Sequence, residues 1–267
     1  MLQLIDGKAI ANRIKDEIAQ KIYNLKGPRP SLAIILVGER SDSELYVSLK
    51  EAEAKKVGVD THLYKLEASS TEEEVLSVIN FLNTDETVDA ILIQLPLPKH
   101  LPTDKIIEAI NPLKDVDGFH PRHPDYIVSP VLASVEACLD EIKFVTDEKK
   151  ACIFYNSEIF GKTIREMLIR RKMEIVERND SDKADLVISA LGEPHKIKKE
   201  MIKKDAVLID IGITKLENKV LGDVDQMDVE KKASFLTPVP GGIGPMTIAY
   251  LFYNVWQIFK QQNNIKE

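Results

Sequence analysis

Cysteine is scarce in this chain of 267 residues. The sequence holds only Cys138 and Cys152, and the two do not form a C-x-x-C pair. They give no disulfide framework of the kind that staples small secreted domains. The scarcity fits a reducing compartment, so we expect the protein in the cytoplasm.

The sequence also shows no long apolar run, no signal-peptide pattern and no segregation of acidic from basic residues. Residues Met1 to Lys15 show no signal-peptide pattern, and no apolar run approaches the roughly 20 residues that a membrane span needs. The formal net charge is -7, with acidic and basic residues mixed along the chain. This mixing lacks the basic footprint of nucleic-acid or membrane binding. We therefore expect small-molecule partners, no nucleic acid and no membrane.

The residues that are present favour a globular α/β protein. Hydrophobic residues make up 44% of the chain, which is enough for a real core. Short apolar runs alternate with longer amphipathic segments, as in α/β proteins with largely parallel sheets. Helices are expected at Asp6–Leu25 and Ser41–Lys56, with capping boxes at Ser41–Glu44 and Thr71–Glu74. The predicted strands are Ser31–Val37, His62–Leu66, Ala90–Gln94, Ala151–Tyr155, Glu174–Glu177, Leu186–Ala190 and Ala206–Ile211.

The chain length predicts two domains, because roughly 150 residues per domain is usual. A break with three prolines and little periodicity runs from Asn111 to Ser129. We place the boundary there, with residues 1–120 in one domain and residues 121–245 in the other. The last helix, residues 246–262, is expected to return to the first domain.

Three glycines and three prolines crowd the segment Thr237–Thr247. Proline fixes φ, and glycine leaves no side chain between the backbone and a bound molecule. Two interpretations stay open. The segment forms either a wall of peptide groups facing a flat ligand or an ordinary turn before the final helix.

Three polar side chains share one face of the helix predicted at Ser41–Lys56. Ser43, Tyr46 and Lys50 are spaced i, i+3 and i+7. A lysine that is partly desolvated loses some preference for its ammonium form and can exchange protons near neutral pH, with a phenol to orient the proton. The alternative is a core-edge tyrosine beside a solvated lysine.

Gln94 ends an apolar strand, and ligands of open α/β sheets bind beyond the carboxyl ends of strands. It is either a site residue or a satisfied core amide. Asp115 and Asp117 precede Gly118 in the break, where one carboxylate can grip the donor groups of a ring. The alternative is a solvated turn or a calcium-loop fragment, which lacks the later glutamate.

Two further signals are weak. His120 and His123 lie beside prolines without another ligand at metal spacing, so we expect no metal. Asn156–Thr163 resembles a nucleotide-binding P-loop without its first glycine, and the phosphate cradle depends on that glycine.

Several motifs occur in a specific order along essentially the whole chain: Tyr46–Lys50, Gln94–Pro98, Lys114–Phe119, Ala184–Leu186, Gly192–Pro194, Ile209–Ile213, Gly222–Val224 and Thr237–Thr247. Together they resemble the bifunctional methylenetetrahydrofolate dehydrogenase/methenyltetrahydrofolate cyclohydrolase family. The resemblance implies two α/β domains flanking a folate cleft, the second a Rossmann-like doubly wound parallel sheet. It also implies a homodimer, tetrahydrofolate substrates and the cofactor NADP, with NAD as the alternative.

The resemblance also implies roles for single residues. Lys50 corresponds to the catalytic lysine, Tyr46 to its aromatic partner, Gln94 to the amide that tunes it and Asp117 to the carboxylate that holds the pterin. The expected substrate-binding residues are Ser43, Pro96, Pro240, Gly241, Gly242 and Pro245. The expected cofactor-binding residues are Tyr155, Asn156, Ser157 and Ile213.

The second domain departs from the family pattern at three places. Tyr155-Asn156-Ser157 stands where Gly-Arg-Ser is usual, the loop Arg178–Lys183 is short, and Pro130–Ala133 replaces Pro-Cys-Thr-Pro. The missing glycine and arginine concern the pyrophosphate and a 2'-phosphate. Arg178 offers another cation for a phosphate, although the charges of Asp180 and Asp182 oppose it. Three hypotheses follow: an enzyme with both activities, a cyclohydrolase with a weak, lost or NAD-dependent dehydrogenase, and a non-enzymatic folate-binding paralogue.

Overall fold

The computed structural model describes residues 1–216 and 219–265, apart from the side chains of Asp42 and Ile159. The chain forms two compact units. The three-strand unit comprises Asn12–Pro130 with Ile248–Glu267, and the six-strand unit comprises Met1–Ala11 with Val131–Thr247. The division thus lies ten residues after the boundary expected at residue 120, and the first eleven residues group with the six-strand unit.

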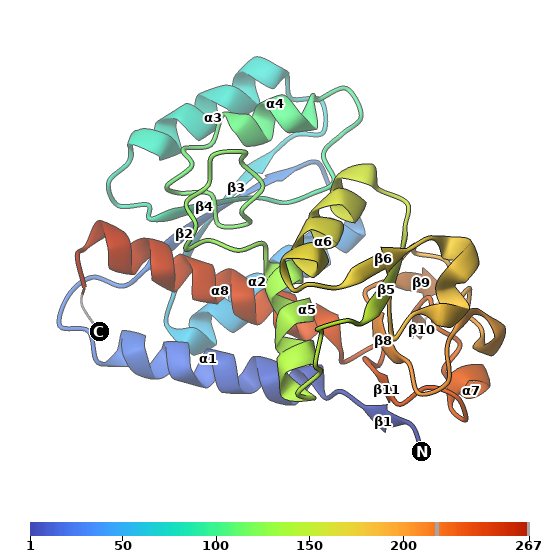
Figure 1. The fold of residues 1–267 in the computed structure, drawn as a ribbon. Coiled ribbons are helices and arrows are strands. Elements are labelled where there is room, and N and C mark those ends of the chain that lie inside the picture. Colours follow the sequence, from blue (N-terminus) through green and yellow to red (C-terminus); the bar gives the residue numbers. More distant parts are fainter. Residues whose placement is uncertain (217–218, 266–267) are drawn as a thin grey trace. The chain divides into compact units, whose positions relative to one another are not determined.

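The three-strand unit is a parallel sheet in the order β3 (Asp60–Leu66), β2 (Ser31–Val37), β4 (Ala90–Ile93). Every residue of β2 is buried, as expected for a central strand covered on both faces. Leu32, Ile34 and Leu36 pack in one core cluster with residues of α1 (Gly7–Tyr23), α2 (Ser41–Val57) and α8 (Ile243–Gln262). Ala33, Ile35 and Val37 pack in another with residues of α3 (Glu72–Thr84) and α4 (Thr103–Glu108). Figure 1 shows α3 and α4 together on one side of this sheet. Because successive side chains of a strand point to opposite faces of the sheet, these two sets of residues pack against two different layers of helices.

The six-strand unit is a parallel sheet in the order β1 (Gln3–Leu4), β11 (Phe235–Leu236), β8 (Val207–Asp210), β7 (Leu186–Ala190), β5 (Lys150–Tyr155), β6 (Glu174–Val176). The chain runs outward from β5 to β6 and then crosses back to β7, so the order reverses between β5 and β7. A doubly wound sheet binds ligands at such a switch point, beyond the carboxyl ends of its strands. The Rossmann-like, doubly wound prediction for this part of the chain is confirmed.

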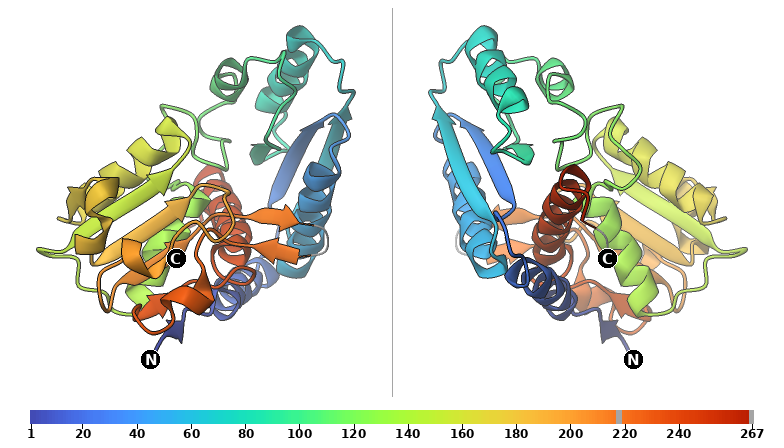
Figure 2. Two further views of the ribbon diagram at one scale, coloured as in Figure 1. Left: turned by 90° about the vertical axis from the view of Figure 1, so that its right-hand side faces the viewer. Right: turned by 90° about the vertical axis from the view of Figure 1, so that its left-hand side faces the viewer.

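The remaining elements of the six-strand unit connect these strands. They are α5 (Pro130–Glu141), α6 (Glu158–Arg170), η1 (Arg178–Lys183), η2 (Lys199–Met201) and α7 (Gln226–Val229). The antiparallel strands β9 (Thr214–Leu216) and β10 (Lys219–Leu221) project from the sheet (Figure 2). No helix in the described ranges has both the length and the apolar character needed to cross a membrane.

Helix starts were predicted with mixed success. Thr71 caps α3 in a complete capping box with Glu74, as predicted. The capping box at Ser41–Glu44 is wrong, because α2 already includes Ser41 and the N-cap is Arg40, which makes no side-chain cap. Glu44 instead forms an ion pair with Lys65 at 2.8 Å.

Candidate active site

Lys50 and Gln94 meet at the carboxyl end of β4. The Lys50 Nζ atom donates a hydrogen bond to Gln94 Oε1 at 2.8 Å, and Gln94 Nε2 donates to the Leu95 carbonyl at 2.7 Å. The Gln94 side chain is only 8% exposed, so both ends of a buried amide are satisfied. The bond to Leu95 fixes which end of the amide faces Lys50, and Gln94 is thereby a positioning residue for the amine.

Asp117 is brought to the same edge by a short pairing with β4. Ile91 donates its N–H to Lys114 O at 2.7 Å and forms a parallel bridge with Asp115. Asp117 follows this bridge by two residues, and its carboxyl lies close enough to Lys50 for the two charges to influence each other's pKa. The sequence motif around Asp117 and the strand that ends in Gln94 are therefore neighbours in space.

Asp115 shapes the turn that carries Asp117. Its buried carboxylate accepts hydrogen bonds from the backbone N–H groups of Asp117 at 3.2 Å and His120 at 2.7 Å. Gly118 follows with φ of +65°, a conformation that a residue with a side chain rarely adopts. The predicted Asp-x-Asp-Gly segment is thus an ordered turn held by the Asp115 carboxylate, and the substrate contact of Asp117 stays a prediction.

Burial at this edge shifts the pKa values of both ionisable groups in the direction of neutral pH. Desolvation lowers the pKa of Lys50, and the charge of Asp117 partly offsets that effect. Desolvation raises the pKa of Asp117 to about 7, opposed by Lys50 and assisted by Asp115. An amine and a carboxyl whose pKa values approach one another can exchange protons with a substrate near pH 7.

The other predicted residues of the three-strand unit lie on nearby elements. Tyr46 lies one helical turn before Lys50 on α2 and is 41% exposed. Ser43 is buried on the same helix. Pro96 follows Gln94 by two residues, after a cis Leu95–Pro96 peptide bond. Their contacts with substrate stay a prediction.

The whole Gly-Pro segment, Thr237–Thr247, belongs to the six-strand unit. Its backbone is packed against the start of α1, since a Cβ added to Gly7 would lie 2.0 Å from the Gly242 carbonyl oxygen. Gly241 has φ of +108°, and its carbonyl accepts a hydrogen bond from Lys8 N at 3.1 Å. The segment is therefore a fixed turn that leads into α8, and the ligand-binding interpretation of Pro240, Gly241, Gly242 and Pro245 stays a prediction.

The predicted cofactor residues gather at the switch point of the six-stranded sheet. Asn156, directly after β5, donates from Nδ2 to the carbonyl of Leu191 after β7 at 2.6 Å. Thr214 Oγ1, after β8, donates to the carbonyl of Gly192 at 2.9 Å. Ile213 is 45% exposed beside it, and Ser157 is the N-cap of α6. The carboxyl ends of β5, β7 and β8 are thus tied together by side chains.

Sequence reasoning missed a buried pair of aspartates that holds these loops. Asp223 accepts hydrogen bonds from Ser189 Oγ and Leu191 N, both at 2.7 Å. Asp210 accepts from Asp223 N at 3.1 Å and Val224 N at 2.8 Å, and burial raises its pKa to about 7. The two motifs that contain Asp210 and Asp223 were visible in the sequence, but nothing in their spacing indicated that one aspartate would bind the backbone of the other.

The P-loop interpretation of Asn156–Thr163 is wrong. Gly161 is the fourth residue of α6, so the residues before it form a helical turn rather than a phosphate-binding loop. A Cβ added to Gly161 would lie 2.5 Å from the Tyr155 ring, so this glycine serves packing.

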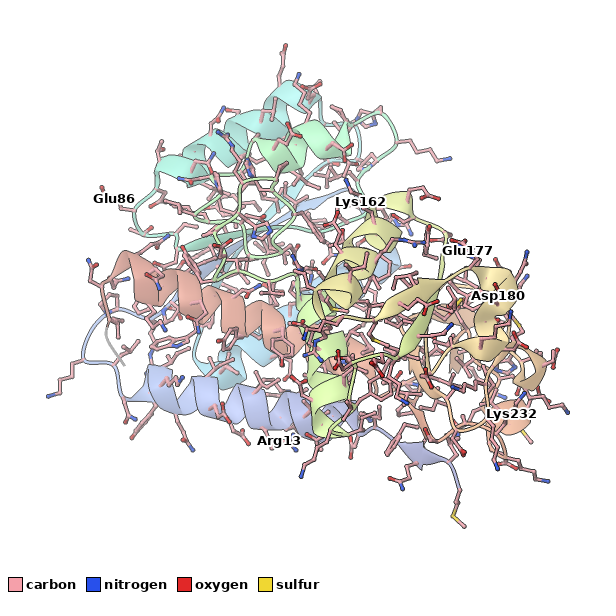
Figure 3. All side chains as sticks on the ribbon, viewed as in Figure 1. Arg13, Glu86, Lys162, Glu177, Asp180 and Lys232 are labelled. Carbon is pink, nitrogen blue, oxygen red and sulfur yellow. The ribbon has the colours of Figure 1, made fainter. Side chains whose placement is uncertain are left out.

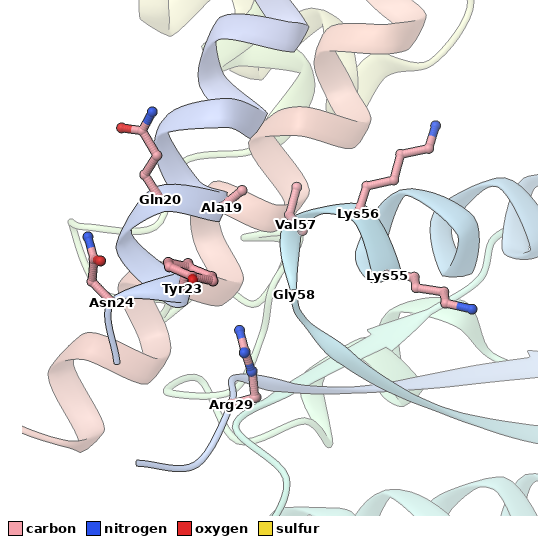
Figure 4. A pocket seen from close by; sticks show the side chains of 9 residues that line it. All are labelled: Ala19, Gln20, Tyr23, Asn24, Arg29, Lys55, Lys56, Val57 and Gly58. Carbon is pink, nitrogen blue, oxygen red and sulfur yellow. The ribbon is translucent and has the colours of Figure 1, made fainter. Parts of the chain in front are cut away.

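A hollow of about 640 Å³ lies elsewhere in the three-strand unit, at the last turns of α1 and α2 (Figure 4). Its cations include Arg29, Lys55 and Lys56, and Lys56 is paired with Glu53 at 2.5 Å. Cations in the last helical turn offset the helix dipole. This hollow adjoins the amino end of β3, whereas Lys50 and Gln94 meet at the carboxyl end of β4.

Two family models match the chain in succession. The model described as "Tetrahydrofolate dehydrogenase/cyclohydrolase, catalytic domain" matches residues 5–117, and the model for the NAD(P)-binding domain of the same enzymes matches residues 131–263. The chain belongs to the tetrahydrofolate dehydrogenase/cyclohydrolase family. Among curated proteins, the "Bifunctional protein FolD" of Sulfurihydrogenibium sp. is 40% identical over 97% of this chain and 98% of its own length.

Solved structures of this tetrahydrofolate dehydrogenase/cyclohydrolase family have the same fold. The bifunctional FolD enzyme of Campylobacter jejuni matches with a TM-score of 0.94 and 36% identity, covering 98% of this chain and 100% of that chain. The FolD enzyme of Trypanosoma brucei, solved with NADP and an inhibitor, matches with a TM-score of 0.92 and 29% identity, covering 98% of each chain.

The six-strand unit of this family member fits an NAD(P) cofactor. The backbone at Gly192 is open, with no atom within 4 Å of an added Cβ. The N-terminus of α6, a helix of 13 residues, lies directly beyond β5 and can face a pyrophosphate. Tyr155 stands where glycine would permit a closer backbone approach, so this chain departs from the usual turn while keeping the switch point.

Proposed function

We propose that this protein oxidises 5,10-methylenetetrahydrofolate to 5,10-methenyltetrahydrofolate and hydrolyses that product to 10-formyltetrahydrofolate. The observation that carries the proposal is the hydrogen bond from Lys50 to Gln94, with the charge of Asp117 acting on the same amine. It occurs in a chain whose two parts match the catalytic and NAD(P)-binding models of the family.

In the hydrolytic step, water adds to the methenyl carbon while the neutral amine of Lys50 accepts a proton from that water. The carbon–N5 bond then breaks, N5 receives a proton, and the formyl group remains on N10. The lowered pKa of Lys50 increases the share of neutral amine at physiological pH, which suits a group that first takes and then returns a proton.

Gln94 and Asp117 support this step in different ways. Gln94 presents a neutral acceptor to Lys50, so it orients the amine without the strong pKa increase that a carboxylate would cause. Asp117, once ionised, accepts hydrogen bonds from the N–H groups of the pterin. Tyr46, Ser43 and Pro96 complete the proposed folate side of the site.

The six-strand unit serves the oxidative step. When bound, a nicotinamide dinucleotide accepts a hydride from the one-carbon bridge. Tyr155, Asn156, Ser157 and Ile213 hold the cofactor in the proposal, at the carboxyl ends of β5 and β8. Pro240, Gly241, Gly242 and Pro245 line the folate in the same proposal.

Both reactions can be measured with the purified protein. Formation of methenyltetrahydrofolate is followed with NADP and with NAD, and its hydrolysis is followed separately without a dinucleotide. Hydrolysis of methenyltetrahydrofolate together with dinucleotide-dependent oxidation supports the proposal. Absence of hydrolysis contradicts it and favours a folate-binding protein without catalysis.

The departures at β5 favour one second candidate. Tyr155 replaces the glycine that would let the backbone approach a pyrophosphate closely, whereas Lys50 and Gln94 form their hydrogen bond. A cyclohydrolase with a weak, lost or NAD-dependent dehydrogenase fits these two facts. The two assays distinguish this candidate from the bifunctional enzyme.

Assembly, location and domain roles complete the proposal. We assign folate binding to residues 1–120 with the helix 246–262, and dinucleotide binding to residues 121–245. The family resemblance supports a homodimer, which analytical ultracentrifugation tests. The two buried free thiols, Cys138 and Cys152, support a cytoplasmic location.

A further inference from the structure

Arg178 reaches from the end of β6 to the neighbouring strand β5. Its guanidinium group donates a hydrogen bond to the Tyr155 carbonyl and lies over the Tyr155 ring, 4.8 Å from the ring centroid. It also lies 5.9 Å from the centroid of Phe154. Although the residue is exposed, its charged group is held at the carboxyl end of β5.

This fixed cation has no acidic partner in the described part of the chain. The structure records no ion pair for Arg178 within residues 1–216 and 219–265. The nearby carboxylate of Asp180 is paired with Lys183 at 2.6 Å. A guanidinium has five N–H donors, and one here serves Tyr155, so the others remain for a ligand.

The location defines which ligand group would meet this cation. In doubly wound folds the dinucleotide lies across the switch point, and the adenosine ribose contacts the residues at the end of the second strand. In this sheet that strand is β6, and Arg178 is two residues beyond its end. An arginine near this position accommodates a 2'-phosphate, whereas an acidic residue binds a free ribose 2'-hydroxyl.

The chain has an acidic residue and an arginine side by side at this position. Glu177, labelled with Asp180 in Figure 3, follows Ser157 by twenty residues and precedes Arg178. The contacts favour the arginine, because its guanidinium is aimed at the carboxyl end of β5 and held there by Tyr155. The same tyrosine that replaces the usual glycine thus supplies the platform for the cation.

We propose that Arg178, stacked on Tyr155, is the residue by which this protein selects NADP over NAD. It would replace the arginine that this chain lacks at Asn156. Asn156 itself is committed to the Leu191 carbonyl at 2.6 Å and brings no charge. The inference rests on the proposed function, which supplies the class of cofactor. It concerns the affinity for the 2'-phosphate and not the rate of either reaction.

Calorimetry with the full-length protein tests the proposal, using 2',5'-ADP and 5'-ADP as probes with and without the 2'-phosphate. We expect the wild-type protein to bind 2',5'-ADP at least about tenfold more tightly. Arg178→Ala and Arg178→Gln should abolish that preference while leaving 5'-ADP affinity unchanged. Arg170→Ala, which removes an exposed arginine at the last turn of α6, should behave as wild type.

Three results would overturn the inference: no preference for 2',5'-ADP in the wild-type protein, a preference that survives in both Arg178 variants, or an equal loss in Arg170→Ala. Thermal unfolding of each variant shows whether the fold is intact, and Arg178→Gln keeps a long polar side chain if Arg178→Ala is unstable. The hydrolysis assay needs no dinucleotide. An Arg178-dependent preference for 2',5'-ADP in a protein that does not hydrolyse the substrate would support the selectivity role of Arg178 and refute the proposed activity. Hydrolysis without such a preference would refute only the selectivity role of Arg178.

Discussion

Lys50 Nζ donates its hydrogen bond to a neutral amide, Gln94 Oε1, at 2.8 Å and across 44 positions of sequence. A carboxylate in the same place would favour the ammonium form of lysine, whereas an amide orients it at little cost to the neutral form. This pairing is consistent with the lowered pKa of Lys50, which desolvation causes.

Replacing Gln94 by glutamate should therefore raise the pKa of Lys50. We expect Gln94→Glu to slow hydrolysis of methenyltetrahydrofolate about tenfold or more at neutral pH, with recovery as the pH rises. The pH profile of kcat measures this shift. Gln20→Glu, an exposed change on α1, is the control. An unshifted profile in Gln94→Glu would show that Gln94 does not tune the amine.

Asp117 should make folate binding depend on pH. Its pKa of about 7 means that the carboxylate, the form that accepts hydrogen bonds, becomes dominant as the pH rises through that value. The KM for the folate substrate should fall across that interval. In Asp117→Asn we expect KM to rise by about tenfold to a hundredfold and to lose this pH dependence.

KM measured from about pH 5.5 to about pH 8.5 checks this prediction. Asp125→Asn, which changes an exposed carboxylate in the following loop, should keep the wild-type profile. A wild-type KM profile in Asp117→Asn would mean that another group titrates.

Asp89 should make stability decrease as the pH rises. Burial raises its pKa from 3.8 to about 6, and its carboxylate accepts a hydrogen bond from Ser31 N at 2.7 Å. The folded state thus binds the proton more tightly than the unfolded state. Its contribution is complete below about pH 4 and is lost as the pH rises through about 6.

The comparison with Asp89→Asn isolates this effect, since asparagine can still accept from Ser31 N. Relative to the variant, the wild-type free energy of unfolding should fall by on the order of 2 kcal/mol between about pH 4 and about pH 6.5. Urea unfolding at both pH values measures the difference, with the exposed Asp60→Asn as control. A constant difference between wild type and Asp89→Asn would contradict the assignment.

The two thiols should be unreactive in the folded protein. Burial raises the pKa of Cys138 to about 12 and that of Cys152 to about 11, and neither side chain is exposed. Because the thiolate is the reactive form, a disulfide reagent should modify both only on unfolding. Rapid modification of the native protein would contradict this, and the denatured protein is the control for complete reaction.

Much of the fold could be read from the sequence. All seven predicted strands exist, and Ser31–Val37 and Leu186–Ala190 match to the residue, because continuous apolar runs are typical of buried parallel strands. The strands β1, β9, β10 and β11 were not predicted. β1 and β11 have two residues each and exist only through pairing with a distant neighbour, which no local pattern records. β9 and β10 have three residues each and pair only with one another.

The site was predicted only in part, because contacts between elements that are distant in sequence leave no local pattern. Helical spacing placed Tyr46 and Lys50 on one face, but the contact between Lys50 and Gln94 depends on how α2 packs on the sheet. The position of Arg178 over Tyr155 depends on the pairing of β5 with β6. Side-chain contacts between elements follow from tertiary packing, and a single sequence does not encode them locally.

The most direct test of the account is the rate of methenyltetrahydrofolate hydrolysis by Lys50→Ala, beside Lys55→Ala on the exposed end of the same helix. The account predicts that Lys50→Ala loses about a hundredfold or more of the activity while Lys55→Ala keeps the wild-type rate. A folded Lys50→Ala protein that hydrolyses the substrate at the wild-type rate would contradict the proton-transfer role of this amine.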